Sequence, residues 1–197
     1  MLSELVKSHT EKLIYAMARL LARAKISPNM LTIMGFLGAL GIACLIAIGR
    51  HELSAVLILL VGILDVLDGA LARVRGMVTL FGGFLDSTLD RFAEVALYLG
   101  LLYFYMYQQP TSRHVIFLIF LSIIGSLMVS YARARAEGLG IECKVGLLTR
   151  FERIIILTVG LFLGRVIIAL WILAIFTNLT ALWRIFHVWR VTKEAQV

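Results

Sequence analysis

The stretch "LDVLDGALARVRGMVTLFGGFLDSTLDR", residues 64–91, places four aspartates inside a chain that is otherwise strongly apolar. Of its 197 residues, 61% are hydrophobic and the mean hydropathy is +0.96, whereas a soluble domain is usually about 45–50% apolar. Apolar runs recur along almost the whole length, which predicts an all-α integral membrane protein with one domain, residues 1–197. Charged groups are costly inside a bilayer, so the aspartates call for a functional explanation.

Six membrane-spanning helices are predicted from the apolar runs, because each run has about the length that a bilayer requires. Their expected ranges are 29–49, 53–75, 80–107, 113–136, 149–163 and 165–190, a six-helix bundle over residues 29–190. Residues 1–25 alternate apolar and charged positions at helical spacing, which predicts an amphipathic helix lying in the membrane interface. Ser27, Pro28 and Asn29 form a helix start signal, with proline early in the first turn.

The basic residues are distributed unevenly between the two sets of helix ends. Of the 19 lysines and arginines, Arg50, Arg113 and Arg165 fall on one side and the remaining sixteen on the other. The positive-inside rule therefore predicts a multi-pass protein of the cell membrane, with both termini and the aspartates on the cytoplasmic side. The formal net charge of +7 is then explained by orientation and by attraction to anionic membrane lipid, and no nucleic-acid partner is expected. Cys44 and Cys143 are far apart and predict neither a disulfide nor a zinc site.

Two pairs of aspartates form a candidate metal site. Asp65 and Asp68 are three residues apart, and Asp86 and Asp90 are four apart, so each pair shares one face of its helix with Cβ atoms about 5–6 Å apart. Two such ionised carboxylates repel by roughly 3 kcal/mol at an effective dielectric constant near 20. Divalent cations would cancel the repulsion, and oxygen ligands without histidine or cysteine favour Mg²⁺, Mn²⁺ or Ca²⁺ over zinc. Two carboxylates from each helix could hold two ions, an arrangement suited to displacement at phosphorus.

A cation-coupled transporter, with the acids as a proton or cation pathway, is the alternative interpretation. Gly69, Ala72 and Gly82 lie close to the acids and leave room either for a ligand or for close helix packing. Arg73, one turn beyond Gly69, can pair with a phosphate. A non-catalytic membrane scaffold is a third class, but it would have no use for four intact aspartates.

Eight residues at fixed spacing resemble the complete signature of the CDP-alcohol phosphotransferases. They read Asp65-x-x-Asp68-Gly69-x-x-Ala72-Arg73, eight residues, then Gly82-x-x-x-Asp86-x-x-x-Asp90. Asn29 and Thr32 match a segment common at the start of the family's first membrane span. The resemblance implies six transmembrane helices, often preceded by an interfacial helix, and commonly a homodimer.

The resemblance also implies a reaction and roles for the residues. A CDP-linked lipid binds at the cytoplasmic face, an acceptor alcohol attacks the phosphorus that bears the lipid, and CMP leaves. The implied ligands of two Mg²⁺ or Mn²⁺ ions are Asp65, Asp68, Asp86 and Asp90, and Asp90 is also the implied general base. The implied nucleotide-binding residues are Asn29, Thr32, Asp65, Asp68, Gly69, Ala72, Arg73 and Gly82.

The basic stretch "SYARARAEGLGIECKVGLLTRFERIII", residues 130–156, bears on the choice of acceptor. Arg133 and Arg135 end one predicted helix and Arg150 and Arg153 begin the next, so together they could surround a phosphate. Taken singly, each is equally well explained by positive-inside charge. The stretch resembles the branch that makes phosphatidylinositol phosphate or its archaeal ether-lipid counterpart, although that branch often has lysine at the position of Arg133.

The expected acceptor is therefore inositol phosphate, with CDP-diacylglycerol or CDP-archaeol as the donor. Glycerol 3-phosphate remains the alternative acceptor, because it also needs a phosphate pocket. Serine or a neutral alcohol would leave the arginines unexplained.

Overall fold

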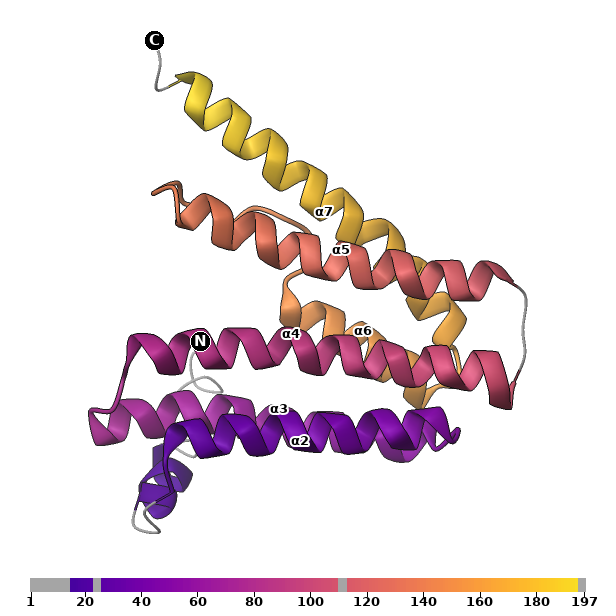
Figure 1. Ribbon diagram of the computed structural model, residues 1–197, viewed down its shortest axis with the longest axis horizontal. Helices are drawn as coiled ribbons and strands as arrows, with labels where there is room; N and C mark the ends of the chain where they lie inside the picture. Colours follow the sequence, from indigo (N-terminus) through magenta and orange to yellow (C-terminus); the bar gives the residue numbers. More distant parts are fainter. Residues whose placement is uncertain (1–14, 23–25, 110–112, 195–197) are drawn as a thin grey trace, which may run out of the picture. The chain divides into compact units, whose positions relative to one another are not determined.

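The computed structural model describes residues 15–22, 26–109 and 113–194, and within these ranges every regular element is a helix (Figure 1). The elements are α2 (Pro28–Ala47), α3 (His51–Arg75), α4 (Leu80–Tyr103), the π-helix η1 (Phe104–Gln108), α5 (Arg113–Glu137), α6 (Arg150–Phe162) and α7 (Val166–Glu194). The all-α prediction is confirmed for the described residues, and each of the six predicted ranges is helical within a few residues of its expected bounds.

Four of these helices, α2, α3, α5 and α7, are long and apolar enough to cross a membrane. α4 has 24 residues but carries Asp86, Asp90, Arg91 and Glu94 within its length. α6 has 13 residues, which corresponds to about 20 Å, shorter than a hydrocarbon core of about 30 Å. The four apolar helices mark a membrane protein, and the crossing of the bilayer by α4 and α6 stays a prediction.

Most of the predicted interfacial helix, residues 1–25, lies outside the described residues. Residues 15–22 are helical, and Ala18 is fully buried against Ala70 and Leu71 of α3. Met17 and Leu20 are exposed. The short helix therefore packs one side against α3 and leaves Met17 and Leu20 exposed, and its place in the membrane interface stays a prediction.

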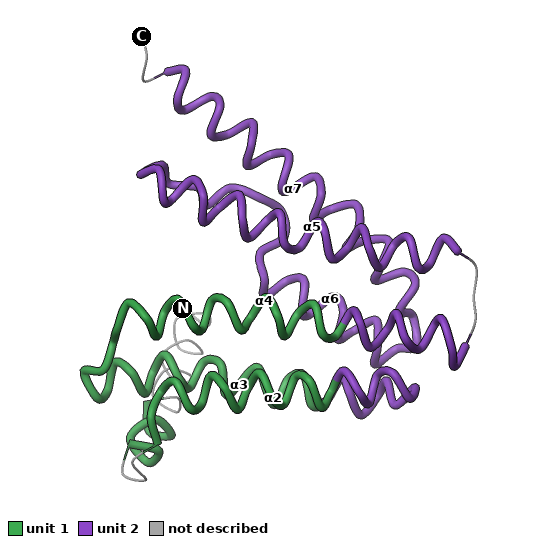
Figure 2. The backbone as a smooth tube through the Cα atoms, viewed as in Figure 1, with its two compact units in different colours: residues 1–42, 57–97 green, residues 43–56, 98–197 purple. Residues whose placement is uncertain are grey.

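The chain divides into two compact units (Figure 2). Unit 1 comprises residues 1–42 and 57–97, and unit 2 comprises residues 43–56 and 98–197. Unit 1 contains the beginning of α2 and most of α3 and α4, whereas unit 2 contains η1, α5, α6 and α7. Whether residues 1–197 act as one domain, as predicted, is not tested by this division.

Short-range capping bonds fix where the helices of unit 1 begin and end. The hydroxyl of Ser27 accepts a 3.2 Å hydrogen bond from the Met30 amide at the start of α2, as the sequence signal predicts. The Thr79 hydroxyl accepts a 3.0 Å bond from the Gly82 amide at the start of α4. α3 ends before Gly76, whose φ of 63° is readily adopted by glycine. These helix ends carry the pocket described below.

In unit 2, small residues let α7 approach its neighbours closely. A Cβ atom at Gly125 of α5 would lie 2.7 Å from Nδ2 of Asn178, and one at Gly160 of α6 would lie 2.5 Å from the Cβ of Ala169. Neither space could hold another side chain without displacing α7, so these glycines set the helix separation. A capping box at the start of α6, in which the Thr149 amide donates a 2.8 Å bond to Glu152, fixes where this helix begins.

One departure from the predicted helices lies after α4. The sequence predicts a continuous helix to residue 107, whereas the backbone changes to a π-helix at Phe104. The Gln109 amide closes this segment with a 2.9 Å bond to the Phe104 carbonyl. Apolar periodicity cannot distinguish the two forms because they differ by one residue in the hydrogen-bond step.

Candidate functional site

Three of the four predicted metal-binding aspartates come together in unit 1. Asp65 and Asp68 from α3 and Asp86 from α4 each present a carboxylate oxygen, and these oxygens all lie within 4.8 Å of one another. The Asp68 side chain is buried, and its Oδ2 accepts a 2.7 Å hydrogen bond from the Thr32 hydroxyl of α2. Three helices thus contribute to one small polar centre.

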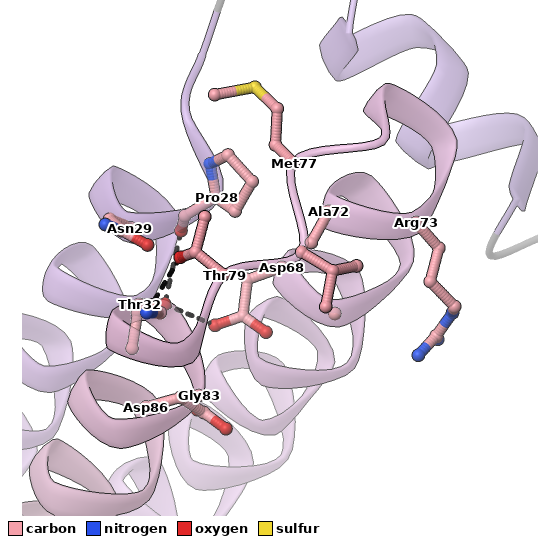
Figure 3. Close-up of a pocket in the computed structure, with 13 residues that line it drawn as sticks. Pro28, Asn29, Thr32, Asp68, Ala72, Arg73, Met77, Thr79, Gly83 and Asp86 are labelled. Atoms are coloured by element: carbon pink, nitrogen blue, oxygen red, sulfur yellow. Dashed lines mark hydrogen bonds between the residues drawn. The ribbon is translucent and has the colours of Figure 1, made fainter.

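A pocket with a volume of about 310 Å³ opens beside these carboxylates (Figure 3). Its lining residues come from the start of α2, the last turns of α3, the α3–α4 turn and the start of α4: Pro28, Asn29, Thr32, Asp68, Gly69, Ala72, Arg73, Met77, Val78, Thr79, Gly82, Gly83 and Asp86. All the predicted nucleotide-binding residues except Asp65 belong to this lining, and Asp65 belongs to the adjacent carboxylate cluster. Every signature residue except Asp90 therefore belongs to the pocket lining or to the adjacent carboxylate cluster.

Five lining residues were not predicted as site residues: Pro28, Met77, Val78, Thr79 and Gly83. Thr79 stands just before the apolar run of α4, where a threonine is a typical helix N-cap, so that signal was present in the sequence. Met77 and Val78 lie in a connection of four residues, 76–79, between α3 and α4, and no periodicity indicates which way such side chains face.

Close packing at Gly82 explains why this signature position carries a glycine. A Cβ atom there would lie 3.0 Å from the Thr79 hydroxyl and 3.2 Å from Oδ1 of Asn29. Any larger residue would push against the cap of α4 and against α2. Gly82 therefore lets these two helix starts meet at the wall of the pocket.

Asp90 lies one turn beyond Asp86 on α4, outside both the three-carboxylate cluster and the pocket lining in the part of the chain that the structure describes. Its side chain is 13% exposed, and its Oδ2 lies 3.5 Å from Nη1 of Arg91. Its roles as a further metal ligand and as general base stay predictions.

The predicted acceptor-binding arginines belong to unit 2. Arg133 and Arg135 lie in the last turns of α5, and Arg150 and Arg153 lie in the first turn of α6. Arg133 forms an exposed 2.8 Å ion pair with Glu137, whereas Arg153 is only 1% exposed. Burial of a guanidinium costs free energy unless its donors are occupied, which makes Arg153 the member of the group least like a surface charge.

Arg184 of α7 joins this region, although the sequence analysis counted it only as a positive-inside charge. It is 3% exposed and lies within electrostatic range of Arg133 and Arg153. Its Nε donates a 2.9 Å hydrogen bond to the Val145 carbonyl, and its Nη1 donates to the Val129 carbonyl. An arginine inside a long apolar helix, six residues before the next arginine Arg190, was the available sequence signal.

The loop between α5 and α6 contains a charge pair of its own. The Lys144 ammonium lies 2.5 Å from Oε1 of Glu142, and both side chains are largely exposed. The ammonium hydrogen-bonds to the Glu142 carboxyl and holds its pKa below the usual range. Lys144 is thus balanced by a neighbouring charge.

The donor set of unit 1 fits a hard divalent cation. Three carboxylates within 4.8 Å supply oxygen ligands, which suit Mg²⁺ or Mn²⁺, and like charges at this distance are stabilised by a cation between them. The adjoining pocket offers Arg73 and a glycine-lined wall to a phosphate-bearing ligand. Together these features describe a membrane protein in which a carboxylate cluster suited to metal ions adjoins a pocket suited to a phosphate-bearing ligand. Enzymes that transfer phosphoryl-type groups have sites of this kind.

Comparison with known proteins identifies the class further. A family model described as CDP-alcohol phosphatidyltransferase matches residues 25–190. Archaetidylinositol phosphate synthase of Methanothermobacter thermautotrophicus is 39% identical over 179 residues, 87% of each chain. The synthase of the same name from Pyrococcus horikoshii is 37% identical over 85% of this chain and 86% of the relative.

Solved structures agree with this. The Mycobacterium tuberculosis phosphatidylinositol phosphate synthase in complex with manganese and citrate matches with a TM-score of 0.85 at 30% identity, covering 89% of this chain and 88% of that chain. The same enzyme with CDP-DAG bound matches with a TM-score of 0.84 at 30% identity over 90% and 94%. The chain belongs to the CDP-alcohol phosphatidyltransferase family, and it is an enzyme of that class. The resemblance stated from the eight signature residues is confirmed.

Proposed function

We propose that this enzyme transfers a phosphatidyl or archaetidyl group from a CDP-linked lipid to inositol phosphate and releases CMP. The observation that carries the proposal is the pocket of Figure 3, in which the predicted nucleotide-binding residues of α2, α3 and α4 gather around Asp68 and Asp86, two members of the three-carboxylate cluster. The names of the relatives above support inositol phosphate over glycerol 3-phosphate as the acceptor.

Two Mg²⁺ or Mn²⁺ ions would be held by Asp65, Asp68 and Asp86, with Asp90 as a further ligand. Bound divalent cations neutralise the diphosphate of the donor and the charge that develops on the leaving CMP. The Thr32 hydroxyl, 2.7 Å from Asp68, fixes the orientation of this carboxylate before any ligand arrives. Such orientation by a second residue preserves ligand geometry.

The donor lipid's nucleotide occupies the pocket. Gly69, Ala72 and Gly82 provide a wall without large side chains, so the cytidine and diphosphate can approach the backbone of α3 and α4. Arg73 pairs with a phosphate oxygen through charge-assisted hydrogen bonds. Asn29 offers an amide to the nucleotide from the start of α2.

Asp90 accepts the proton of the attacking hydroxyl. The acceptor oxygen forms a bond to the phosphorus that bears the lipid, the bond from this phosphorus to the bridging oxygen breaks, and CMP leaves with the electron pair. Asp90 is suited to this role because it lies one helical turn from Asp86, close to the cluster without belonging to it. A carboxylate near divalent cations keeps a low pKa and stays available as a base.

The acceptor's phosphate binds to arginines at the end of α5 and the start of α6: Arg133, Arg135, Arg150 and Arg153. We add Arg184 to this group because it is buried within electrostatic range of two of them. Arg153 and Arg184 are the buried members, 1% and 3% exposed, and an anion that binds beside them would be stabilised by both charges. A phosphate dianion is such an anion.

The same proposal includes the topology and assembly. All six helices from α2 to α7 cross the cell membrane, residues 1–25 form an interfacial helix, and both termini and the active site face the cytoplasm. The uneven distribution of lysine and arginine supports this orientation. Residues 1–197 act as one membrane domain, and two copies form a homodimer, as is common in the family.

A CMP-release assay on purified protein tests the function directly. The donor is CDP-diacylglycerol or CDP-archaeol, and the acceptors are inositol phosphate, free inositol, glycerol 3-phosphate and serine at equal concentration. We expect inositol phosphate to give the fastest release, with Mg²⁺ or Mn²⁺ required and excess EDTA abolishing it. Preference for serine or free inositol would contradict the phosphate-pocket argument, and preference for glycerol 3-phosphate would change only the acceptor.

A further inference from the structure

The Arg75 guanidinium connects the last residue of α3 to the segment that precedes α2. Its Nη1 donates a 2.7 Å hydrogen bond to the Ile26 carbonyl, and its Nη2 donates a 3.0 Å bond to the Ala22 carbonyl. The two acceptors lie 49 and 53 residues away in the sequence. One side chain thus ties together two ends of the helices that line the pocket.

The short helix of residues 15–22 reinforces this connection. Ala18, Ala70 and Leu71 form a fully buried apolar cluster, against which Leu21 and Ala22 pack. Ala70 and Leu71 lie between the pocket residues Gly69 and Ala72 on α3. The short helix therefore packs against the same turn of α3 that forms the pocket wall.

The hydrogen bond from Arg75 to the Ile26 carbonyl lies next to the start of α2, which lines the pocket. Ile26 stands immediately before the Ser27 cap, and Asn29 and Thr32 follow within two turns of α2. When the first turn of an α-helix is fixed, the following turns are fixed with it, because the backbone is hydrogen-bonded throughout. The place of the Ile26 carbonyl consequently decides where the Thr32 hydroxyl meets Asp68.

We infer that Arg75 is a positioning residue for the CDP-lipid pocket, which it serves by fixing the start of α2 against the end of α3. It belongs neither to the pocket lining nor to the carboxylate cluster, and it is not one of the signature residues, whose part on α3 ends two residues earlier at Arg73. The inference rests on the proposed function only in taking this pocket as the CDP-lipid site. If Arg75 served only to orient the protein in the membrane, lysine could replace it. A planar guanidinium that donates hydrogen bonds to two carbonyls cannot be replaced by the single ammonium of lysine.

Binding of CDP in the presence of Mn²⁺, measured by calorimetry on the full-length protein in lipid nanodiscs, tests the inference without the acceptor. We expect Arg75→Gln to weaken CDP binding by about tenfold or more, the scale of losing charge-assisted hydrogen bonds. For Arg75→Lys, the increase in log Kd relative to the wild type should be more than half of the increase seen for Arg75→Gln. Arg190→Gln is the matched control, because Arg190 is an exposed arginine of α7 whose 2.9 Å partner is Glu194.

Hydrogen exchange on the same variants separates local positioning from general loss of structure. In Arg75→Gln we expect faster exchange at residues 26–32, with α4 and α7 unchanged. Wild-type CDP binding in Arg75→Gln, full rescue by lysine, or faster exchange spread evenly over all helices would each overturn the inference. Hydrogen exchange needs no ligand, so it tests the positioning role even if the wild-type protein binds no CDP. Absence of CDP binding by the wild-type protein would contradict the proposed function, not the positioning role of Arg75.

Discussion

The Thr32 hydroxyl on α2 donates a 2.7 Å hydrogen bond to Oδ2 of Asp68 on α3, across 36 residues of sequence. Oγ1 of Thr32 also lies 3.2 Å from the Pro28 carbonyl oxygen, but the hydroxyl has one proton, and the shorter distance assigns it to the carboxylate. This bond joins α2 to the carboxylate cluster, because Thr32 lines the pocket and Asp68 belongs to both the lining and the cluster.

Replacing Thr32 with valine removes the hydroxyl and keeps the shape of the side chain. A hydrogen bond to a charged group is worth about 1.5–3 kcal/mol, which corresponds to roughly 10-fold to 100-fold in an equilibrium constant. We expect Thr32→Val to raise the Mn²⁺ concentration needed for half-maximal CMP release by about this factor. Thr32→Ser keeps the hydroxyl and should stay close to wild type, and equal metal requirements in the two variants would refute the orienting role.

Substitution of Gly82 tests the close approach of α2 and α4. An added methyl group would lie 3.0 Å from the Thr79 hydroxyl and 3.2 Å from Oδ1 of Asn29. Gly82→Ala should raise the KM for the CDP-lipid by about tenfold, because overpacking commonly costs about 1–3 kcal/mol. Gly41→Ala on α2 is the control, since nothing lies within 4 Å of its added Cβ. Similar kinetics for both variants would remove the steric explanation.

Asp90 and Asp65 should differ in what their loss affects. Asp90→Asn removes the proposed proton acceptor, so turnover should fall by about 10²–10⁴-fold while CDP binding changes little. Asp65→Asn removes a member of the 4.8 Å cluster and should weaken the binding of both Mn²⁺ and CDP. The rate of CMP release gives the turnover, and calorimetry gives the dissociation constants for CDP and Mn²⁺. Near-normal turnover of Asp90→Asn would show that another group is the base.

Arg153 and Arg73 should act on different substrates. Arg153 is buried in unit 2, and Arg73 lines the nucleotide pocket in unit 1. Arg153→Ala should raise the KM for inositol phosphate by about a hundredfold, as expected for two charge-assisted bonds, and should affect the KM for the CDP-lipid much less. Arg73→Ala should show the reverse.

Because Arg153 is buried, a loss of folding could imitate this effect. The thermal midpoint of each variant and the activity of Arg153→Lys therefore serve as controls. An equal rise in both KM values for Arg153→Ala, in a protein with the wild-type thermal midpoint, would remove Arg153 from the acceptor site.

The proposed topology makes opposite predictions for two connecting segments. The loop after α5 should be cytoplasmic and the segment after η1 external, as the positive-inside distribution indicates. In a variant with Cys44→Ser and Cys143→Ala, an impermeant thiol reagent applied to intact cells should label Gln109→Cys and leave Glu142→Cys unlabelled. The inverse pattern would reverse the orientation.

Much of this protein could be predicted from local sequence, because its strongest signals are local in kind. A run of about 20 apolar residues becomes a helix wherever it lies in the chain, and the cap at Ser27 and Pro28 fixes a helix start without help from distant residues. The signature spacing placed Asp65 and Asp68 on one face of α3, since helical geometry alone decides which residues share a face.

Contacts between helices were beyond such reasoning. The bond from Thr32 to Asp68 and the burial of Arg184 both depend on how separate helices pack. Arg75 shows the difference most plainly, because by sequence it is one more positive-inside charge, whereas in the fold it holds the carbonyls of Ala22 and Ile26. Sequence periodicity shows in which direction a side chain points from its own helix axis. Which residue that side chain contacts depends on the separation and rotation of the neighbouring helices, and these are set by side-chain packing.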